Sequence, residues 1–176
     1  MSDSTEQWKW DSMVIILMGV SGAGKTRIGK RLAAALAWSF YEGDDYHSQS
    51  NVEKMSQGIA LTDADRAPWL DALHELIGEL LAQDESAVLT CSALKRAYRE
   101  RLGHGHDGVR IVYLHGSYEL IRQRLKERRG HFMKADLLAS QFEALEAPDA
   151  SEGVLTVDVS QKPQRIVEAI KRELTG

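Results

Sequence analysis

Short apolar runs alternate with longer amphipathic stretches along the chain, and this alternation predicts the fold. Five runs rich in apolar and β-branched residues are typical of buried strands and cover residues 14–18, 38–41, 87–91, 110–114 and 154–159. Apolar residues recur at helical spacing over residues 27–37, 64–83, 118–128, 134–145 and 163–174. Strands separated by helices predict an α/β fold with a mostly parallel sheet that helices cover on both faces.

The segment directly after the first strand carries the strongest motif. Residues 19–26 read Gly-Val-Ser-Gly-Ala-Gly-Lys-Thr and match G-x-x-x-x-G-K-[ST] at every position. The glycines let backbone N–H groups surround an anion, and the next helix directs its positive end to the same place. In this motif Lys25 reaches the β- and γ-phosphates and the Thr26 hydroxyl holds Mg²⁺. The predicted nucleoside triphosphate contacts are Gly19, Ser21, Gly22, Ala23, Gly24, Lys25 and Thr26.

Polar residues follow the second strand, where ligands of parallel sheets bind. Asp44 is expected to accept a proton from an acceptor hydroxyl or to hold Mg²⁺ through water. A helix cap or a solvated turn is the alternative, and it is the simpler explanation for Asp45. His47 either contacts a sugar hydroxyl or is an ordinary polar surface residue.

The polar segment 45–66 lies where an acceptor-binding flap would be inserted, between the second strand and the long helix. Its Lys54 and Arg66 suit an anionic acceptor. Alternatively, Lys54 is a solvated helix charge and Arg66 pairs with Asp63 or Asp65. These two interpretations stay open at the level of the sequence.

The third strand is followed by two further cations. Ser92 is expected to cap a helix on which Lys95 and Arg99, four residues apart, share one face. A guanidinium group recognises a carboxylate with two parallel hydrogen bonds, so this pair suits a carboxylate acceptor. Solvated helix charge is the alternative. Cys91 is expected to be a small buried residue and not a nucleophile.

Arginines precede a glycine near residue 130 and suggest a lid at about 128–136. Arg124 and Arg128 lie four residues apart and share a helix face. Phosphoryl transfer spreads negative charge over oxygen atoms, which arginines on a closing lid stabilise while they exclude water. The alternative is a solvated basic helix end, which the helix dipole favours.

Composition narrows the class of protein. A length of 176 residues predicts one domain, over 13–176, after a flexible leader at 1–12. With 22 Lys+Arg against 26 Asp+Glu, the chain lacks the basic character of a nucleic-acid-binding domain. No apolar run approaches the roughly 18 residues of a membrane span, and no signal peptide is recognised, so we expect a cytoplasmic protein without a membrane partner. The single cysteine excludes an intramolecular disulfide framework.

Taken together, the motifs resemble the gluconate kinase (gluconokinase) family, within the adenylate kinase/shikimate kinase-like P-loop kinases. Besides 18–26, the resemblance rests on G-D-x-x-H at 43–47, N-x-E-K-M at 51–55, G-x-x-L-x-D-x-D-R-x-P-W-L at 58–70, C-S-A-L-K at 91–95, Y-R at 98–99, R-L-K-x-R at 124–128, G-H-F at 130–132 and Q-F-x-x-L-E at 141–146. It implies a P-loop kinase fold with a five-stranded parallel sheet in the order 2-3-1-4-5. It also implies ATP and Mg²⁺ as cofactors, in-line transfer of a phosphoryl group to D-gluconate, and a homodimer.

Residue roles follow from the resemblance position by position. It implies Asp44 as the base, Arg124 near the adenine and Arg128 near the phosphates. The predicted catalytic residues are Lys25, Asp44 and Arg128. The predicted substrate contacts are Asp44, His47, Lys54, Arg66, Lys95 and Arg99.

The third strand ends in Thr-Cys-Ser at 90–92 and lacks the aspartate that many P-loop proteins carry there. Ligands of Mg²⁺ beyond Thr26 therefore stay open.

Other P-loop functions fit the sequence less well. Shikimate kinases have a glycine run after the third strand, where this chain has Ser-Ala-Leu at 92–94. A related kinase that acts on a nucleoside monophosphate is another alternative. A GTPase switch would need an N-K-x-D motif, which the chain lacks. A nucleotide-binding protein without catalysis is disfavoured by Lys25, Thr26, Asp44 and the lid arginines.

Overall fold

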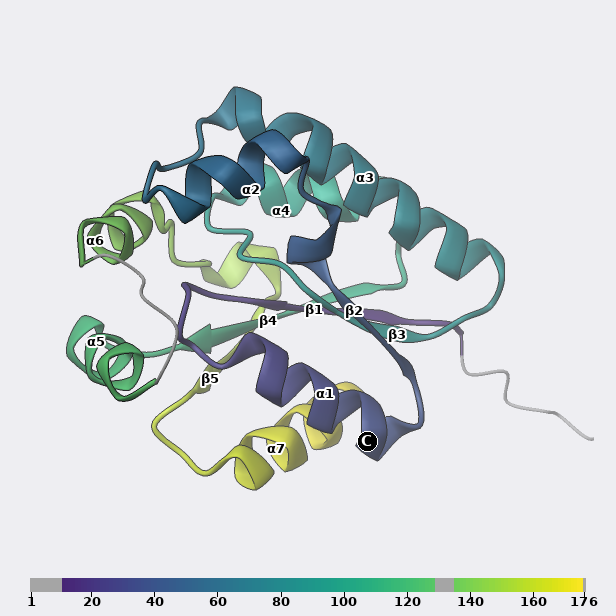
Figure 1. Ribbon diagram of the computed structural model, residues 1–176. Helices are drawn as coiled ribbons and strands as arrows, with labels where there is room; N and C mark the ends of the chain where they lie inside the picture. Colours follow the sequence, from purple (N-terminus) through teal and green to yellow (C-terminus); the bar gives the residue numbers. More distant parts are fainter. Residues whose placement is uncertain (1–10, 129–134, 176) are drawn as a thin grey trace, which may run out of the picture.

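A parallel β-sheet forms the centre of the computed structural model, which describes residues 11–128 and 135–175 (Figure 1). Its strands are β1 (Val14–Met18), β2 (Ser39–Glu42), β3 (Ala87–Thr90), β4 (Val109–His115) and β5 (Leu155–Asp158). Their order is β2-β3-β1-β4-β5, and every neighbouring pair is parallel. The α/β class and the strand order implied by the family resemblance are both confirmed.

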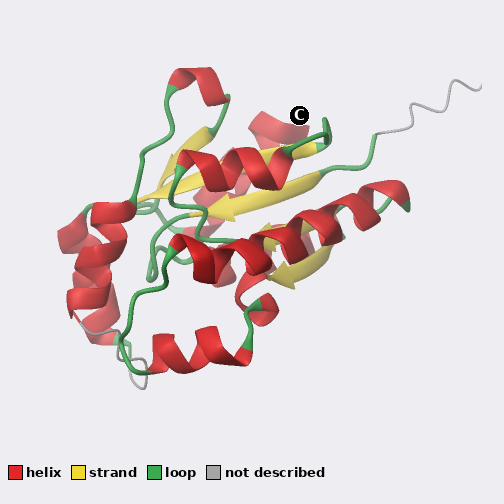
Figure 2. Ribbon diagram, turned by 90° about the horizontal axis from the view of Figure 1, so that it is seen from above, coloured by secondary structure: helices red, strands yellow, loops and turns green. Residues whose placement is uncertain are grey.

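Helices cover both faces of this sheet (Figures 1 and 2). On one face lie α1 (Lys25–Leu36) and α7 (Pro163–Thr175), and on the other lie α3 (Asp63–Ala82) and α4 (Arg96–Gly103). The remaining helices are α2 (Gln49–Ser56), α5 (Tyr118–Glu127), α6 (Ala135–Ala144) and the short 3₁₀ turns η1 (Gly43–Tyr46) and η2 (Ala150–Glu152). In the part of the chain that the structure describes, no helix has the length and apolar character that crossing a bilayer requires.

Strand β1 is apolar at every position because it separates two hydrophobic cores. Ile15 and Leu17 belong to the core beneath α1 and α7, whereas Val14, Ile16 and Met18 belong to the core beneath α3 and α4. All five side chains are fully buried. A strand that is covered on both faces lacks polar alternation, which explains the continuous apolar run in the sequence.

The start of α3 is fixed by a reciprocal pair of hydrogen bonds. The N-cap residue Thr62 accepts from the backbone N–H of Asp65, and the Asp65 carboxylate accepts from the backbone N–H of Thr62. This capping box satisfies two N–H groups that a helix end otherwise leaves without partners. It places the first turn of α3, with its charged side chains, at the carboxyl-end edge of the sheet.

Two local predictions differ from the structure. The segment 45–66 contains the helix α2, which the sequence pattern did not predict because its eight residues carry few apolar positions. Ser92 does not cap α4, since the N-cap is Lys95 in an extended backbone conformation. Residues 1–10 of the predicted leader and 129–134 of the predicted lid lie outside the described residues.

The turn after β2 passes very close to β3, and glycine at position 43 makes this possible. A Cβ atom at Gly43 would lie 2.0 Å from the carbonyl oxygen of Thr90. We expect Gly43→Ala to push β2 away from β3 and to lower the free energy of unfolding by about 3 kcal/mol, a magnitude typical of overpacking. Urea unfolding would measure this difference.

Gly103→Ala is the matched control, because a Cβ atom there would meet only Val109 Cγ1 at 4.0 Å. Its position at the end of α4 predicts an unchanged or slightly higher stability. Equal stability of the two variants would contradict the importance of the close approach.

Candidate active site

The phosphate-binding loop of residues 19–24 connects β1 to α1 and is held in place by α5 and α6 (Figure 1). Gly22 has a φ angle of +83°, and a Cβ atom there would lie 2.9 Å from Leu125 Cγ in α5. From α6, the Gln141 side chain accepts from the Ser21 backbone N–H at 2.7 Å and donates to Ser21 Oγ at 3.1 Å. The glycine is therefore required both for its conformation and for the passage of the loop beneath α5.

Lys25, the first residue of α1, bonds back to the phosphate-binding loop. Its Nζ donates to the carbonyl oxygens of Gly19 and Val20 at 2.9 and 3.0 Å. Burial lowers the pKa of Lys25, while Asp44 raises it and Arg128 lowers it further. Asp44 and Arg128, which the sequence predicts as catalytic residues together with Lys25, thus both act electrostatically on Lys25.

Glu42, the last residue of β2, joins the phosphate-binding loop to β3. Its two carboxylate oxygens accept hydrogen bonds from the hydroxyl groups of Thr26 at 2.6 Å and Thr90 at 2.5 Å. The register of the sheet places Glu42 directly beside Thr90. Sequence reasoning missed Glu42, although its place at the carboxyl end of a strand next to the motif was the available signal.

These oxygen atoms fit Mg²⁺ in their chemistry. Mg²⁺ is a hard cation that proteins commonly hold through one or two carboxylates together with substrate phosphates. Glu42 supplies one carboxylate beside the Thr26 hydroxyl, at the edge where the motif predicts phosphates. Over residues 11–128 and 135–175, no group of three or more His, Cys, Asp or Glu side chains is arranged to hold a metal ion.

Asp44 and His47 lie in and after the 3₁₀ turn η1, and they differ in exposure. The Asp44 side chain is 71% exposed, whereas that of His47 is only 4% exposed. The His47 ring stacks on Trp69 with centroids 4.1 Å apart, and Trp69 Nε1 donates to the carbonyl oxygen of Gly43 at 2.8 Å. Burial lowers the pKa of His47. The turn is thus anchored on α3, and Asp44 is among the side chains that it exposes.

The flap is anchored to α3 by a second set of bonds. Lys54 Nζ forms an ion pair with Asp65 Oδ1 at 2.9 Å, and Asn51 Nδ2 donates to the Asp65 carbonyl oxygen at 2.9 Å. The hydrogen bond from Lys54, followed by that from the Thr62 N–H, lowers the pKa of Asp65 to about 2. Lys54 is therefore an ion-paired residue and not a free solvated charge.

Arg66 and Lys95 meet where α3 and α4 begin. Arg66 Nη1 donates to the hydroxyl of Tyr98 at 3.3 Å, and Lys95 Nζ donates to Asp63 Oδ1 at 2.9 Å. The Tyr98 hydroxyl in turn donates to the same Asp63 oxygen. Arg66 therefore bonds to Tyr98. It does not pair with Asp63 or Asp65, which the sequence left open as partners.

The prediction that Lys95 and Arg99 share one helix face was wrong. Lys95 precedes the helix, whereas the Arg99 side chain points inward and is 2% exposed. The Arg99 guanidinium donates to both carboxylate oxygens of Glu152 and to the carbonyl oxygens of Ala93, Leu94 and Glu146. All five of its N–H groups are used, so Arg99 holds the fold and has none left for a substrate carboxylate.

The two predicted lid arginines lie on and after α5. Arg124 Nη2 donates to the carbonyl oxygen of Val159 at 2.6 Å, which links α5 to the end of β5. Arg128 is the exposed C-cap of α5 and acts electrostatically on Lys25. The rest of the predicted lid through residue 134 lies outside the described residues.

Comparisons with known proteins show the family of the chain. The family model described as "AAA domain" matches residues 14–148. A "Probable gluconokinase" of Xenopus tropicalis is 46% identical, with 92% of this chain and 93% of the relative covered, and the "Thermosensitive gluconokinase" of Escherichia coli (strain K12) is 45% identical, with 89% and 84% covered. The chain belongs to the gluconokinase family. The family resemblance predicted from the motifs is confirmed.

A solved structure supports the same assignment for this gluconokinase-family chain. The crystal structure of a gluconokinase from Sinorhizobium meliloti 1021 superposes with a TM-score of 0.80 at 45% identity, and the match covers 90% of this chain and 89% of the other. Similarity at this level extends through the sheet and both helical layers.

Cys91, the only cysteine of the chain, lies beside the site but is chemically protected. Burial raises the pKa of its thiol to about 12. At pH 8 the thiolate fraction is then lower by about three powers of ten than for a free thiol with a pKa near 8.5. We expect a disulfide reagent to label the native protein far more slowly than the denatured one. Rapid labelling of the native protein would contradict the buried position of the thiol.

Proposed function

We propose that the protein is a gluconokinase that transfers the γ-phosphoryl group of ATP to the terminal hydroxyl of D-gluconate. The observation that carries the proposal is a complete phosphate-binding motif whose Thr26 hydroxyl bonds to Glu42, two residues before Asp44. The gluconokinase names of the relatives support the choice of acceptor. The products would be ADP and 6-phospho-D-gluconate.

In the proposed reaction, the acceptor hydroxyl oxygen forms a bond to the γ-phosphorus as the bond to the bridging oxygen of ADP breaks. Asp44 accepts the hydroxyl proton, and Lys25 and Arg128 stabilise the charge that spreads over the phosphoryl oxygens. Positioning and charge stabilisation are the main sources of rate enhancement in phosphoryl transfer. The exposure of Asp44 suits this role, since its carboxylate is accessible to an acceptor.

We propose that the Thr26 hydroxyl and the Glu42 carboxylate would hold Mg²⁺ at the phosphate-binding loop. When bound, Mg²⁺ neutralises phosphate charge. Glu42 then supplies from β2 the carboxylate that many P-loop proteins supply from the end of β3. Thr90, which occupies that place here, bonds to Glu42.

The cations Arg66 and Lys95 would bind the carboxylate of gluconate, at the far end of the acceptor from Asp44. His47 and Lys54 would act by holding the flap in place, because both are engaged with α3. The remaining expectations stay predictions: Arg124 near the adenine, a lid over about 128–136, a flexible leader, a homodimer and a cytoplasmic location.

The function is tested by ATP-dependent ADP release with Mg²⁺ over a panel of acceptors. We expect turnover with D-gluconate and none with shikimate, glucose or nucleoside monophosphates. Turnover with another member of the panel and not with gluconate would keep the kinase fold and remove the proposed acceptor.

Asp44→Asn tests the proposed base. The amide cannot accept the hydroxyl proton, so we expect kcat to fall by about 10² or more while ATP affinity changes little. Asp45→Asn is the matched control, because Asp45 is the exposed neighbour in the same turn and should leave kcat within about three-fold of the unchanged protein. Near-normal turnover of Asp44→Asn would remove Asp44 from the mechanism.

Glu42→Gln tests the proposed Mg²⁺ ligand. We expect the Mg²⁺ concentration for half-maximal activity to rise by about 10- to 100-fold, and the gain in ATP affinity on adding Mg²⁺ to shrink in direct binding measurements. Glu85→Gln is the control, since Glu85 accepts from Ser39 and Tyr41 at the beginning of β2, far from the motif. An unchanged Mg²⁺ dependence in Glu42→Gln would exclude the proposed ligand.

A further inference from the structure

Four side chains from α3 and from the start of α4 form a cluster that we call the carboxylate clamp: Asp63, Arg66, Lys95 and Tyr98. The clamp lies near the proposed acceptor site, because Arg66 lies one turn before Trp69 on α3. Trp69 stacks on His47, and its Nε1 donates to the carbonyl oxygen of Gly43, directly before Asp44. The clamp therefore lies at the edge of the sheet where the acceptor would bind.

Tyr98 is the centre of the clamp. Its hydroxyl accepts from Arg66 Nη1 at 3.3 Å and donates to Asp63, which also accepts from Lys95 at 2.9 Å. Arg66 and Lys95 both lie over the Tyr98 ring, at 5.6 and 5.7 Å from its centroid. The Tyr98 side chain is itself buried. One buried ring thus lies beneath two cations, one from α3 and one from the residue that precedes α4.

The charges of the clamp match one carboxylate. Arg66 and Lys95 supply two positive charges and Asp63 supplies one negative charge, which leaves one positive charge to be balanced. The neighbouring Lys54 is already balanced by Asp65. Within residues 11–128 and 135–175, one N–H of Arg66 and one of Lys95 form hydrogen bonds to side chains. Both cations therefore keep donors for an acceptor.

We propose that Tyr98 is a positioning residue for acceptor binding, because its hydroxyl couples Arg66 to the Asp63–Lys95 pair and so sets both cations for one carboxylate. The proposal rests on the proposed function. Tyr98 does not touch the reacting atoms. Its loss is expected to weaken binding of gluconate and to leave the chemical step in place.

Tyr98→Phe keeps the ring and its packing and removes only the hydroxyl. We expect the KM for gluconate to rise by about ten-fold, as is typical for loss of a hydrogen bond to a charged group. We expect kcat to stay within about three-fold and the KM for ATP within about two-fold. An unchanged KM for gluconate would overturn the proposal.

A double-mutant cycle with Arg66→Met distinguishes positioning from general structural support. If Tyr98 acts through Arg66, Tyr98→Phe should change the KM for gluconate by less than about two-fold in the Arg66→Met background. A full ten-fold effect in that background would show additivity and would overturn the proposal.

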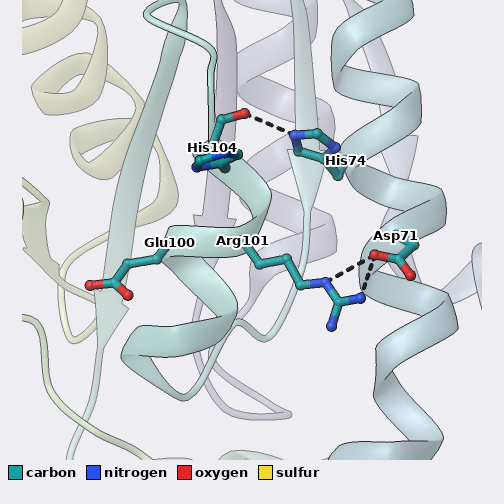
Figure 3. A pocket seen from close by; sticks show the side chains of 5 residues that line it. All are labelled: Asp71, His74, Glu100, Arg101 and His104. Atoms are coloured by element: carbon teal, nitrogen blue, oxygen red, sulfur yellow. Dashed lines mark hydrogen bonds and ion pairs between the residues drawn. The ribbon is translucent and has the colours of Figure 1, made fainter.

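Two control variants separate the clamp from the rest of the α3–α4 interface. Figure 3 shows a pocket further along these helices, where Arg101 Nε donates to Asp71 Oδ1 at 2.9 Å. Asp71→Ala breaks this second link between the same helices, and Tyr41→Phe removes another hydroxyl that bonds to a carboxylate. Both should keep the KM for gluconate. A ten-fold rise of the KM for gluconate in Asp71→Ala would assign the effect to helix docking and overturn the proposal.

The unchanged protein reports on the proposed function in the same experiment. If it does not phosphorylate gluconate, the proposed function fails and the role of Tyr98 fails with it. If it does, and Tyr98→Phe has a normal KM, only the role of Tyr98 is overturned.

Discussion

The Glu42 carboxylate, shared by the hydroxyl groups of Thr26 and Thr90, is the interaction on which the geometry of the site depends. It joins the end of β2 to β3 and to the first turn of α1. The approach of Gly43 to the Thr90 carbonyl oxygen brings these elements close enough for the bridge to form. Because Asp44 follows Gly43 directly, the same contact determines where the proposed base lies relative to the phosphate-binding loop.

The acceptor side is built by anchoring short segments onto α3. His47 stacks on Trp69 and Lys54 pairs with Asp65, so the turn η1 and the helix α2 are both held by this one long helix. The capping box at Thr62 fixes where that helix begins. A polar segment that carries little apolar surface of its own is thereby ordered, since its few buried groups find partners on a rigid element.

The sequence predicted the fold and the phosphate-binding loop because both depend on local patterns. Strand β1 and the motif at 19–26 follow from hydrophobicity and glycine spacing, and the family resemblance added the strand order. Arg99 was misassigned because spacing along a helix does not reveal which face is buried, and here five acceptors surround its guanidinium. Glu42 was missed because its partners come from other segments, which only the sheet register brings together.

Nearly every cation predicted to bind substrate has an internal partner, and this pairing bears on selectivity. Arg99 with Glu152 and Lys54 with Asp65 are balanced pairs. Of the predicted substrate contacts in the described part of the chain, the cations of the carboxylate clamp keep an excess of one positive charge. A neutral sugar would leave this charge without a counter-ion, whereas a phosphate ester with two negative charges would exceed it. Electrostatic matching of this kind selects between ligands more than it raises affinity. On the proposed function, Asp63 would favour acceptors with a single carboxylate although it would compete with them for Lys95.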